Sequence, residues 1–148
     1  MYNLSNFIQL LKDYISLFDA LVEVEQEKLL AAKKNRVTFV EEAMKKEQVY
    51  ILQLKGYDKK REQIQQELGF SSLSFQQILE QVSKEENDQL TPLFYQFQEK
   101  VALLQEVSEN AKKMIELNLH TIEKALKQEK ADSASSQKPI GSFHSRKI

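Results

Sequence analysis

Apolar residues near the start of the chain recur at alternating steps of four and three residues. That period places them on one face of an α-helix, which we expect to run from about Asn3 to Lys34. Acidic residues such as Asp19 and Glu23 fall on the opposite face. The apolar seam is Leu4, Ile8, Leu11, Ile15, Phe18, Val22, Glu25, Leu29 and Ala32, widened along one edge by Phe7, Tyr14 and Leu21.

A short polar break at Lys33, Lys34 and Asn35 separates this helix from a second one. Asn35 can end one helix or cap the next, and Thr38 with Glu41 matches a capping box. The second helix should run to about residue 68, so each helix has about 31 residues and a length of about 46 Å. Equal lengths and a short connection predict an antiparallel helical hairpin.

The second helix has its own seam and an interruption at Gly56, which costs about 1 kcal/mol relative to Ala. Gly56 is a site of close backbone approach or a weak point in the helix. Gly69 follows the helix, as is usual at a C-terminus. The seam is Val37, Val40, Met44, Ile51, Leu54, Tyr57, Arg61, Ile64 and Leu68.

Ser74 and Gln77 match a second capping box and begin a short helix with Phe75, Ile78, Leu79 and Val82 on one side. Charged residues 84–88 are expected to end this short helix. The next helix is expected to start at Thr91-Pro92, because Pro is tolerated in a first helical turn. The last helix should run to about Gln128. Its stripe is Phe94, Phe97, Val101, Leu104, Ser108, Ala111, Ile115, Asn118, Ile122 and Ala125, joined late by Leu119 and Leu126.

The fold class that follows is all-α: a long antiparallel hairpin, a short helix and a third long helix. A length of 148 residues suits one domain, and three Gly and two Pro are too few for a fold built on many β-turns. We expect a helical domain over residues 1–130. Residues 131–148 are polar, rich in Ser and interrupted by Pro139 and Gly141, which predicts a disordered tail.

Composition argues against several classes of function. A net charge of −1 does not suit a nucleic-acid binder, and the absence of Cys excludes disulfides and thiolate sites. Two His leave little room for His-based catalysis. Glu116, His120 and Glu123 share a helical face, but we interpret His120 as a surface residue rather than a metal ligand. We therefore expect no enzyme activity and no cofactor. Without a signal peptide or a membrane span, we expect a cytoplasmic protein.

Two charged residues lie on the predicted seams. We interpret Glu25 as a carboxylate that reaches water at the far end of the hairpin, or as the partner of Lys45 or Lys46 on the second helix. For Arg61 we expect the stem to pack and the guanidinium to leave the seam. We interpret the aromatic residues Phe94, Tyr95 and Phe97 as part of the core rather than of a ligand pocket.

The late stripe of the last helix has no fourth long helix to cover it. Either the chain self-associates as a structural coiled-coil protein, or the stripe receives a helix from a partner. We expect the second, with Val101, Leu104, Ile115, Leu119, Ile122 and Leu126 as the binding surface. In the tail, Phe143 lies among polar and basic residues, as in short docking motifs.

Residues 21–70 resemble the FlgN family of flagellar type III export chaperones. The last helix is similar too, with Met114-Ile115 and then Leu119 in the places of a Leu-Ile pair and a Leu of that family. The matching positions in the hairpin are Leu21-Val22, Glu25, Leu29-Leu30-Ala31, Asn35, Phe39-Val40, Lys46-Glu47, Arg61 and Leu68-Gly69.

The resemblance implies a chaperone that binds hook-associated junction proteins before their export. Such a chaperone clasps the terminal amphipathic helices of these proteins with its C-terminal helical region, keeps them soluble and presents them to the export gate. It also implies that an aromatic residue of the tail helps to dock on the gate, and Phe143 is the one aromatic residue of this tail. Holding a client in this way requires no catalytic group.

Overall fold

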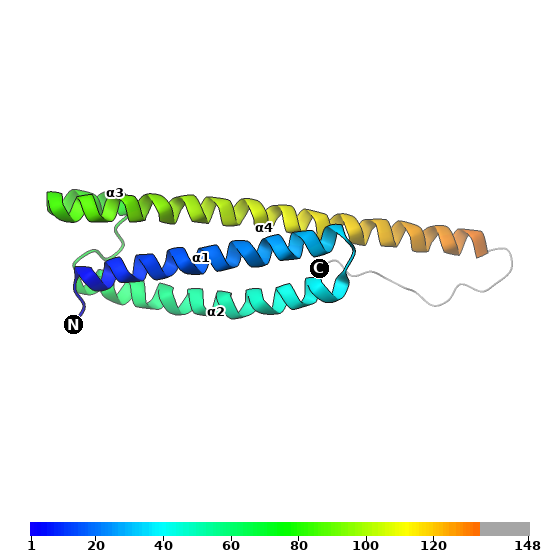
Figure 1. Ribbon diagram of the computed structural model, residues 1–148, viewed down its shortest axis with the longest axis horizontal. Coiled ribbons are helices and arrows are strands. Elements are labelled where there is room, and N and C mark those ends of the chain that lie inside the picture. The colour runs from blue at the N-terminus through cyan, green and yellow to red at the C-terminus, as the bar shows by residue number, and fades with distance from the viewer. Residues whose placement is uncertain (134–148) are drawn as a thin grey trace.

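The computed structural model describes residues 1–133, with the side chains of residues 1–121 and 123–128. Within these residues the only regular secondary structure is helical, with no strand, which confirms the predicted fold class (Figure 1). The four helices are α1 (Leu4–Lys33), α2 (Val37–Glu67), α3 (Phe75–Gln81) and α4 (Lys84–Ser133).

The first two helices form the predicted antiparallel hairpin (Figure 1). The connection turns at Asn35, whose φ of 53° lies in the left-handed region that Asn tolerates better than most residues. The N–H of Arg36 closes the turn by donating to the Ala31 carbonyl at 2.9 Å. Arg36 is the N-cap of α2 and makes no side-chain cap, so the expected capping box at Thr38 is wrong.

Local capping also sets the start of α4, and here the expected break over residues 84–88 is wrong. The Ser83 hydroxyl accepts a hydrogen bond from the Glu86 N–H at 3.2 Å, and Glu86 Oε1 accepts one from the Ser83 N–H at 3.0 Å. This reciprocal capping box makes the charged run the first turn of a helix. Pro92 therefore lies inside α4 rather than at its start, and α4 continues to Ser133.

The predicted start of α3 and the predicted glycine after α2 are confirmed. Ser74 and Gln77 form the capping box of α3, with the Ser74 hydroxyl accepting from the Gln77 N–H at 3.2 Å. Gly69 follows α2 with a φ of 79°, a conformation that suits Gly. Gly56, by contrast, has no atom within 4 Å of where a Cβ would lie, so the predicted close backbone approach is wrong.

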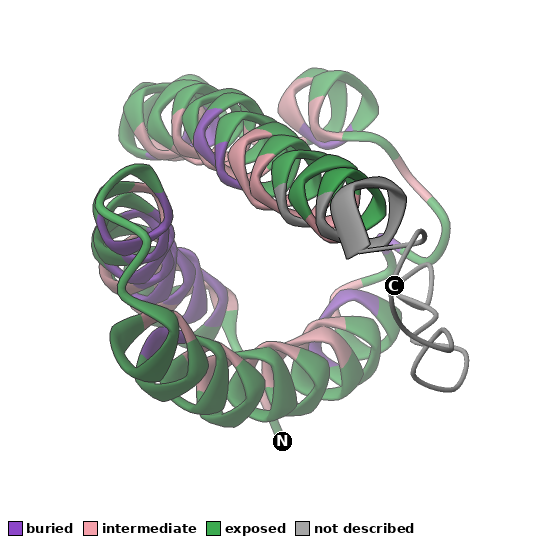
Figure 2. Ribbon diagram, turned by 90° about the vertical axis from the view of Figure 1, so that its right-hand side faces the viewer, coloured by how far each residue is buried: buried purple, intermediate pink, exposed green. Residues whose placement is uncertain are grey.

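The long helices lie side by side in an open arc, with α1 in the middle (Figure 2). α2 packs along one side of α1 and α4 along the other, while α3 packs against α4. α4 runs in the same direction as α1, and α2 runs against both (Figure 1). Among the described helices, α2 and α4 make no close backbone approach to each other. The arc therefore has an open side between them.

The core is concentrated at the start of α1 and of α4, where α3 packs against α4. Phe7 is buried there, with its ring 6.1 Å from that of Phe94, and the rings of Phe75 and Phe94 stack at 4.1 Å. Phe94 and Phe97 thus belong to the core, as predicted. Tyr95 does not, because it is 66% exposed.

Contacts on two sides give α1 a wider buried face than its seam predicted. Leu10, Leu17 and Val24 are buried although they lie off the seam, while Ile8 and Ile15 are only half-buried. In α2, which contacts only α1, the buried residues are Ala43, Ile64 and Gln65. The predicted α2 seam is therefore wrong at its start, where Val37, Met44 and Ile51 are exposed.

The carboxylate of Glu25 is neither solvated nor paired with a lysine of α2. Glu25 is 2% exposed and lies 3.0 Å from Lys28 Nζ on its own helix, through Oε2. Lys28 Nζ also lies 2.9 Å from Glu47 Oε2 on α2, so one cation joins two carboxylates across the hairpin. Lys46, one of the expected partners, pairs with Glu27 instead. Both interpretations of Glu25 are therefore corrected.

Candidate functional site

The first half of α4 is held firmly against α1. Lys100 Nζ lies 2.8 Å from Asp19 Oδ1, and this hydrogen bond and the charge of Asp19 raise the pKa of Lys100. Farther along, Val107 and Ala111 are buried. This part of α4 is a structural element of the fold.

The six residues predicted to bind a partner share one helix but differ in environment. Val101 and Leu104 are half-buried and pack against the core. Ile115, Leu119 and Leu126 are also half-buried, yet they are not among the residues that pack on that core. The Ile122 side chain and Phe143 lie outside the described part of the structure.

Asn118 marks the place where α4 leaves the hairpin. Its side-chain amide donates a hydrogen bond to the carbonyl of Ala32, in the last turn of α1. Beyond it, α4 runs past the turn between α1 and α2 (Figure 1). Residues 119–133 form this projecting segment, which is about 22 Å long at 1.5 Å per residue. The hairpin therefore ends before Leu119 and Leu126.

A cleft of about 430 Å³ lies on the open side of the arc, between α2 and α4. Gln65, one of its residues, donates from Nε2 to the Phe70 carbonyl at 3.1 Å and so ties α2 to the segment before α3. Val101 lines the cleft from α4. A fourth helix placed in this cleft would complete a bundle. The lining is Arg61, Gln65, Leu73, Ser74, Phe75, Phe97, Gln98, Val101, Ala102 and Gln105.

An apolar stripe on α2 extends from this cleft toward the turn of the hairpin. Val37, Met44 and Ile51 are spaced by seven residues and are 64%, 39% and 39% exposed. The same spacing leads on through Asp58 to Gln65, which lines the cleft. Residues spaced by seven lie on nearly the same face of a helix. The stripe therefore borders the open side of the arc.

Polar side chains within the fold tie helices together. The Tyr14 hydroxyl donates to Asp58 Oδ1 at 2.6 Å, and Arg61 Cζ lies 5.8 Å from the centre of the Tyr14 ring. Burial, and then the bond to Asp58, raise the pKa of Tyr14 well above its usual value. The guanidinium of Arg61 thus stays beside the hairpin interface instead of leaving it. The group joins α1 to α2.

The helical face with Glu116 and His120 is exposed, in agreement with the interpretation of His120 as a surface residue. The described side chains, those of residues 1–121 and 123–128, include no group of three or more His, Asp or Glu residues that is arranged to hold a metal ion. Nor does any helix in that part of the chain have an apolar stretch long enough to cross a bilayer.

Sequence reasoning missed the roles of Lys28 and Asn118. Lys28 is 9% exposed, and its signal was the spacing of three residues from Glu25, which places both on one helical face. Asn118 was recognised as a polar position in an apolar stripe. Its partner, the Ala32 carbonyl, is a backbone group near a helix end and carries no signal in the sequence.

Comparison with known proteins gives one match. The family model described as "FlgN protein" matches residues 1–136, which include all four helices. Searches of curated proteins and of solved structures found no significant match.

Proposed function

This chain belongs to the FlgN family of flagellar export chaperones, and we propose that it binds the terminal helices of hook-associated junction proteins in the cytoplasm, keeps them soluble and delivers them to the type III export gate. The observation that carries the proposal is the projecting segment of α4. It bears an apolar stripe at helical spacing in a place that the hairpin does not reach.

The mechanism is holding by side-chain packing. Client helices with exposed apolar faces aggregate unless those faces are covered. Leu119 and Leu126 are spaced by seven residues, the repeat with which a second helix packs in a coiled coil. A client helix laid along them would bury apolar surface of both chains, at about 25 cal/mol per Å². Affinity then comes from packing alone, and no catalytic group takes part.

The cleft between α2 and α4 gives this surface a natural continuation. A client helix that starts on the projecting segment and follows α4 past Ile115 would reach Leu104 and Val101. Val101 lines the cleft, and there the client would occupy the position of the missing fourth helix, beside the apolar stripe of α2. The six binding residues thus become one surface, with its accessible end beyond Asn118.

A double substitution in the projecting segment tests client binding. Leu119→Asp with Ile122→Asp should abolish co-purification with a hook-associated protein while the helical content stays unchanged, because charges on the stripe cannot be buried in the complex. Leu117→Asp with Thr121→Asp is the matched control, since both residues are exposed and lie on another face of α4. Retained binding by the first variant, or equal loss by both, would show that the surface is wrong.

We assign delivery to the tail, with Phe143 as the residue that docks on the export gate. Deletion of Ala131–Ile148 should leave client binding intact and reduce secretion of the client into the medium, and Phe143→Ala should reproduce the loss of secretion. Co-purification and secretion are measured in parallel. If the deletion abolishes client binding, the tail and the helical domain do not divide the work in this way.

The alternative use of the same stripe is self-association. A structural coiled-coil protein would cover Ile115–Leu126 with a second copy of itself and would have no client. Light scattering separates the two functions. A stable homo-oligomer that the Leu119→Asp, Ile122→Asp variant disrupts, without any binding to hook-associated proteins, would favour the alternative.

A further inference from the structure

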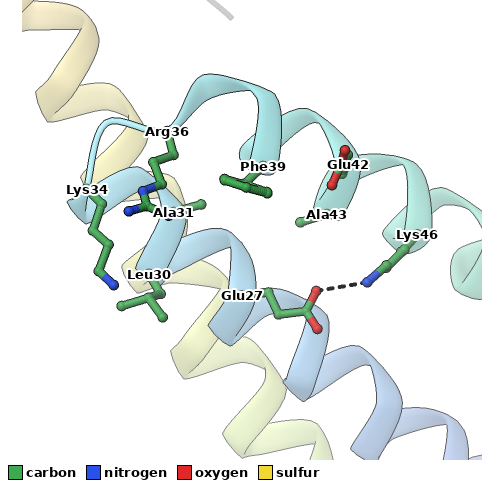
Figure 3. A pocket seen from close by; sticks show the side chains of 9 residues that line it. All are labelled: Glu27, Leu30, Ala31, Lys34, Arg36, Phe39, Glu42, Ala43 and Lys46. Atoms are coloured by element: carbon green, nitrogen blue, oxygen red, sulfur yellow. Dashed lines mark hydrogen bonds and ion pairs between the residues drawn. The ribbon is translucent and has the colours of Figure 1, made fainter.

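A second exposed site lies at the turn of the hairpin, in a pocket between α1 and α2 (Figure 3). It has a volume of about 300 Å³, and no residue of α4 lines it. Leu30 and Phe39 are 53% and 52% exposed and contribute apolar surface from the two helices, together with the buried Ala31 and Ala43. This volume accommodates one large apolar side chain.

Lys34 and Arg36 line the end of this pocket that lies at the turn, and Lys33 precedes them in the sequence. Lys33, Lys34 and Arg36 lie within four consecutive positions of the turn, and all three are exposed. Among the described residues, the ion pairs are made by Lys28, Lys46, Arg61 and Lys100, and none by these three cations. The Arg36 guanidinium is 5.7 Å from the centre of the Phe39 ring, so the cation and the apolar surface form one feature.

The acidic residues at the pocket are arranged differently. Glu27 is already paired with Lys46, whose Nζ lies 3.3 Å from Glu27 Oε2 (Figure 3). Glu42 also lines the pocket, away from the turn. The charges around the pocket are therefore unevenly distributed, with unpaired positive charge at the turn and negative charge farther along α2.

We propose that this pocket is a second protein-docking site, which receives one large apolar side chain from an acidic segment of a partner protein. The apolar anchor enters between Leu30 and Phe39, and its acidic neighbours on one side lie over Lys34 and Arg36. Large anchors in pockets supply most of the energy of such contacts, and charge complementarity sets their orientation and rate of association.

Charge and shape favour a peptide segment over an anionic membrane. A flat anionic surface pressed on the turn would meet the carboxylates of Glu27 and Glu42 together with the cations. A segment can place its acidic residues at the turn alone, and its anchor can enter a pocket that a flat surface cannot fill. Because no residue of α4 lines the pocket, a client helix on the projecting segment of α4 would not cover it.

The test uses the full-length chain and short fluorescent peptides. In the first peptide one Phe lies beside a run of Glu; in the others Ser replaces the Phe, or Lys replaces each Glu. Fluorescence anisotropy at low ionic strength measures affinity, and backbone amide chemical shifts locate the contact. We expect saturable binding of the first peptide, shifts around residues 27–46, about tenfold weaker binding without the Phe and none with Lys.

Variants of the protein provide the matched comparison. Phe39→Ser, and separately Lys33→Glu with Lys34→Glu and Arg36→Glu, should each weaken binding of the first peptide by about tenfold. The controls are Leu52→Ser, at a residue that is 67% exposed, and charge reversal of the exposed residues Lys55, Lys59 and Lys60. They should leave binding unchanged, and circular dichroism checks that every variant is folded.

Three results would overturn the proposal. One is the absence of saturable binding by the acidic peptide. Another is an equal loss of peptide affinity in the variants at the turn and in the control variants. The third is tighter binding to vesicles of phosphatidylcholine with phosphatidylglycerol than to the acidic peptide, lost in the same variants at the turn. That result would make the turn a membrane contact.

Discussion

At the scale of single residues, the hairpin is distinguished by the buried charges of Glu25 and Lys28, which pair with each other, and by the half-buried Glu47, which pairs with Lys28. Taking charges out of water is costly, and their attraction offsets the cost only while every charge keeps its partner. Lys28 lies 3.0 Å from Glu25 and 2.9 Å from Glu47, so a single ammonium serves both carboxylates. The contact with Glu47 crosses from α1 to α2 and fixes their relative register.

Removal of the shared cation should therefore destabilise the protein. Lys28→Met leaves two carboxylates without a partner and should lower the free energy of unfolding by about 3 kcal/mol in urea titrations at neutral pH. The control is Lys46→Met, which breaks a pair whose side chains are 58% and 53% exposed and should cost less than about 1 kcal/mol. Equal losses in the free energy of unfolding for the two variants would mean that the ion pairs of Lys28 contribute no more to stability than an exposed ion pair.

Tyr14 makes stability depend on pH above neutrality. Its pKa is raised in the folded chain by burial and by the hydrogen bond to Asp58, so the folded state disfavours the phenolate. The stability gained from the neutral phenol is fully present below the unfolded pKa of about 10 and is lost as the pH rises from there toward the folded pKa.

Tyr14→Phe keeps the ring contacts and removes the hydroxyl. It should cost about 1 kcal/mol at neutral pH, because Asp58 loses a hydrogen-bond donor, and it should reduce the loss of stability above pH 10. Urea titrations at a series of pH values measure both effects. Stability curves that stay parallel for wild type and Tyr14→Phe would refute the assignment.

At the scale of elements, capping residues set the boundaries of the helices. Ser74 and Ser83 each begin a helix through a box with the residue three positions later. The second box makes α4 one helix of 50 residues, where the charge run and Pro92 had predicted a break. Pro92 lies in the interior of this helix, and the acidic residues Glu85 and Glu86 suit the positive end of its dipole.

Two glycines of the hairpin should respond to Ala in opposite ways. Gly56 lies inside α2 with open space around its Cα, so Gly56→Ala should raise the free energy of unfolding by about 0.5–1 kcal/mol. Gly69 has a φ of 79°, so Gly69→Ala should lower that free energy by about 1 kcal/mol. Thermal unfolding followed by circular dichroism reports both signs. A loss at Gly56 would reveal a contact there.

At the scale of the whole molecule, the chain is well packed at one end and open at the other. α3 closes the aromatic core at one end, whereas α4, about 75 Å long, outruns the hairpin of about 45 Å at the other (Figure 1). This asymmetry separates stability from binding. The aromatic core lies toward the closed end, whereas the projecting segment and the pocket at the turn lie toward the open end. The Val101 end of the proposed client surface reaches back to the cleft beside the core.

Truncation after Asn118 should demonstrate this separation. The shortened chain should keep its melting temperature within a few degrees, lose helical signal in proportion to the residues removed, and lose binding to the client. Ile78→Ala, at a residue that is 0% exposed, should instead cost about 2–5 kcal/mol and leave client binding intact below its melting temperature. A large fall in melting temperature on truncation would place the removed segment in the folded core.

The periodicity of apolar residues and the turn chemistry were enough to predict the fold class, the hairpin, α3 and the stripe of α4, because helical period and capping are local properties. The candidate surface was predictable to the same extent: Leu119 and Leu126 belong to a visible stripe. Whether a stripe is covered depends on tertiary contacts and not on the local sequence. Val37, Met44 and Ile51 have the same pattern as buried residues, and only the open arc leaves them exposed.

Tertiary structure alone decided three things about this protein: the pairing of Lys28 with Glu47 across the hairpin, the parallel course of α1 and α4, and the place beyond Asn118 where α4 leaves the hairpin. Each depends on residues far apart in the chain, brought together by packing that no short window of sequence contains. The amino-acid sequence by itself determined that these helices form and which of their faces are apolar. Their arrangement in space determined which of those faces stay free for a partner.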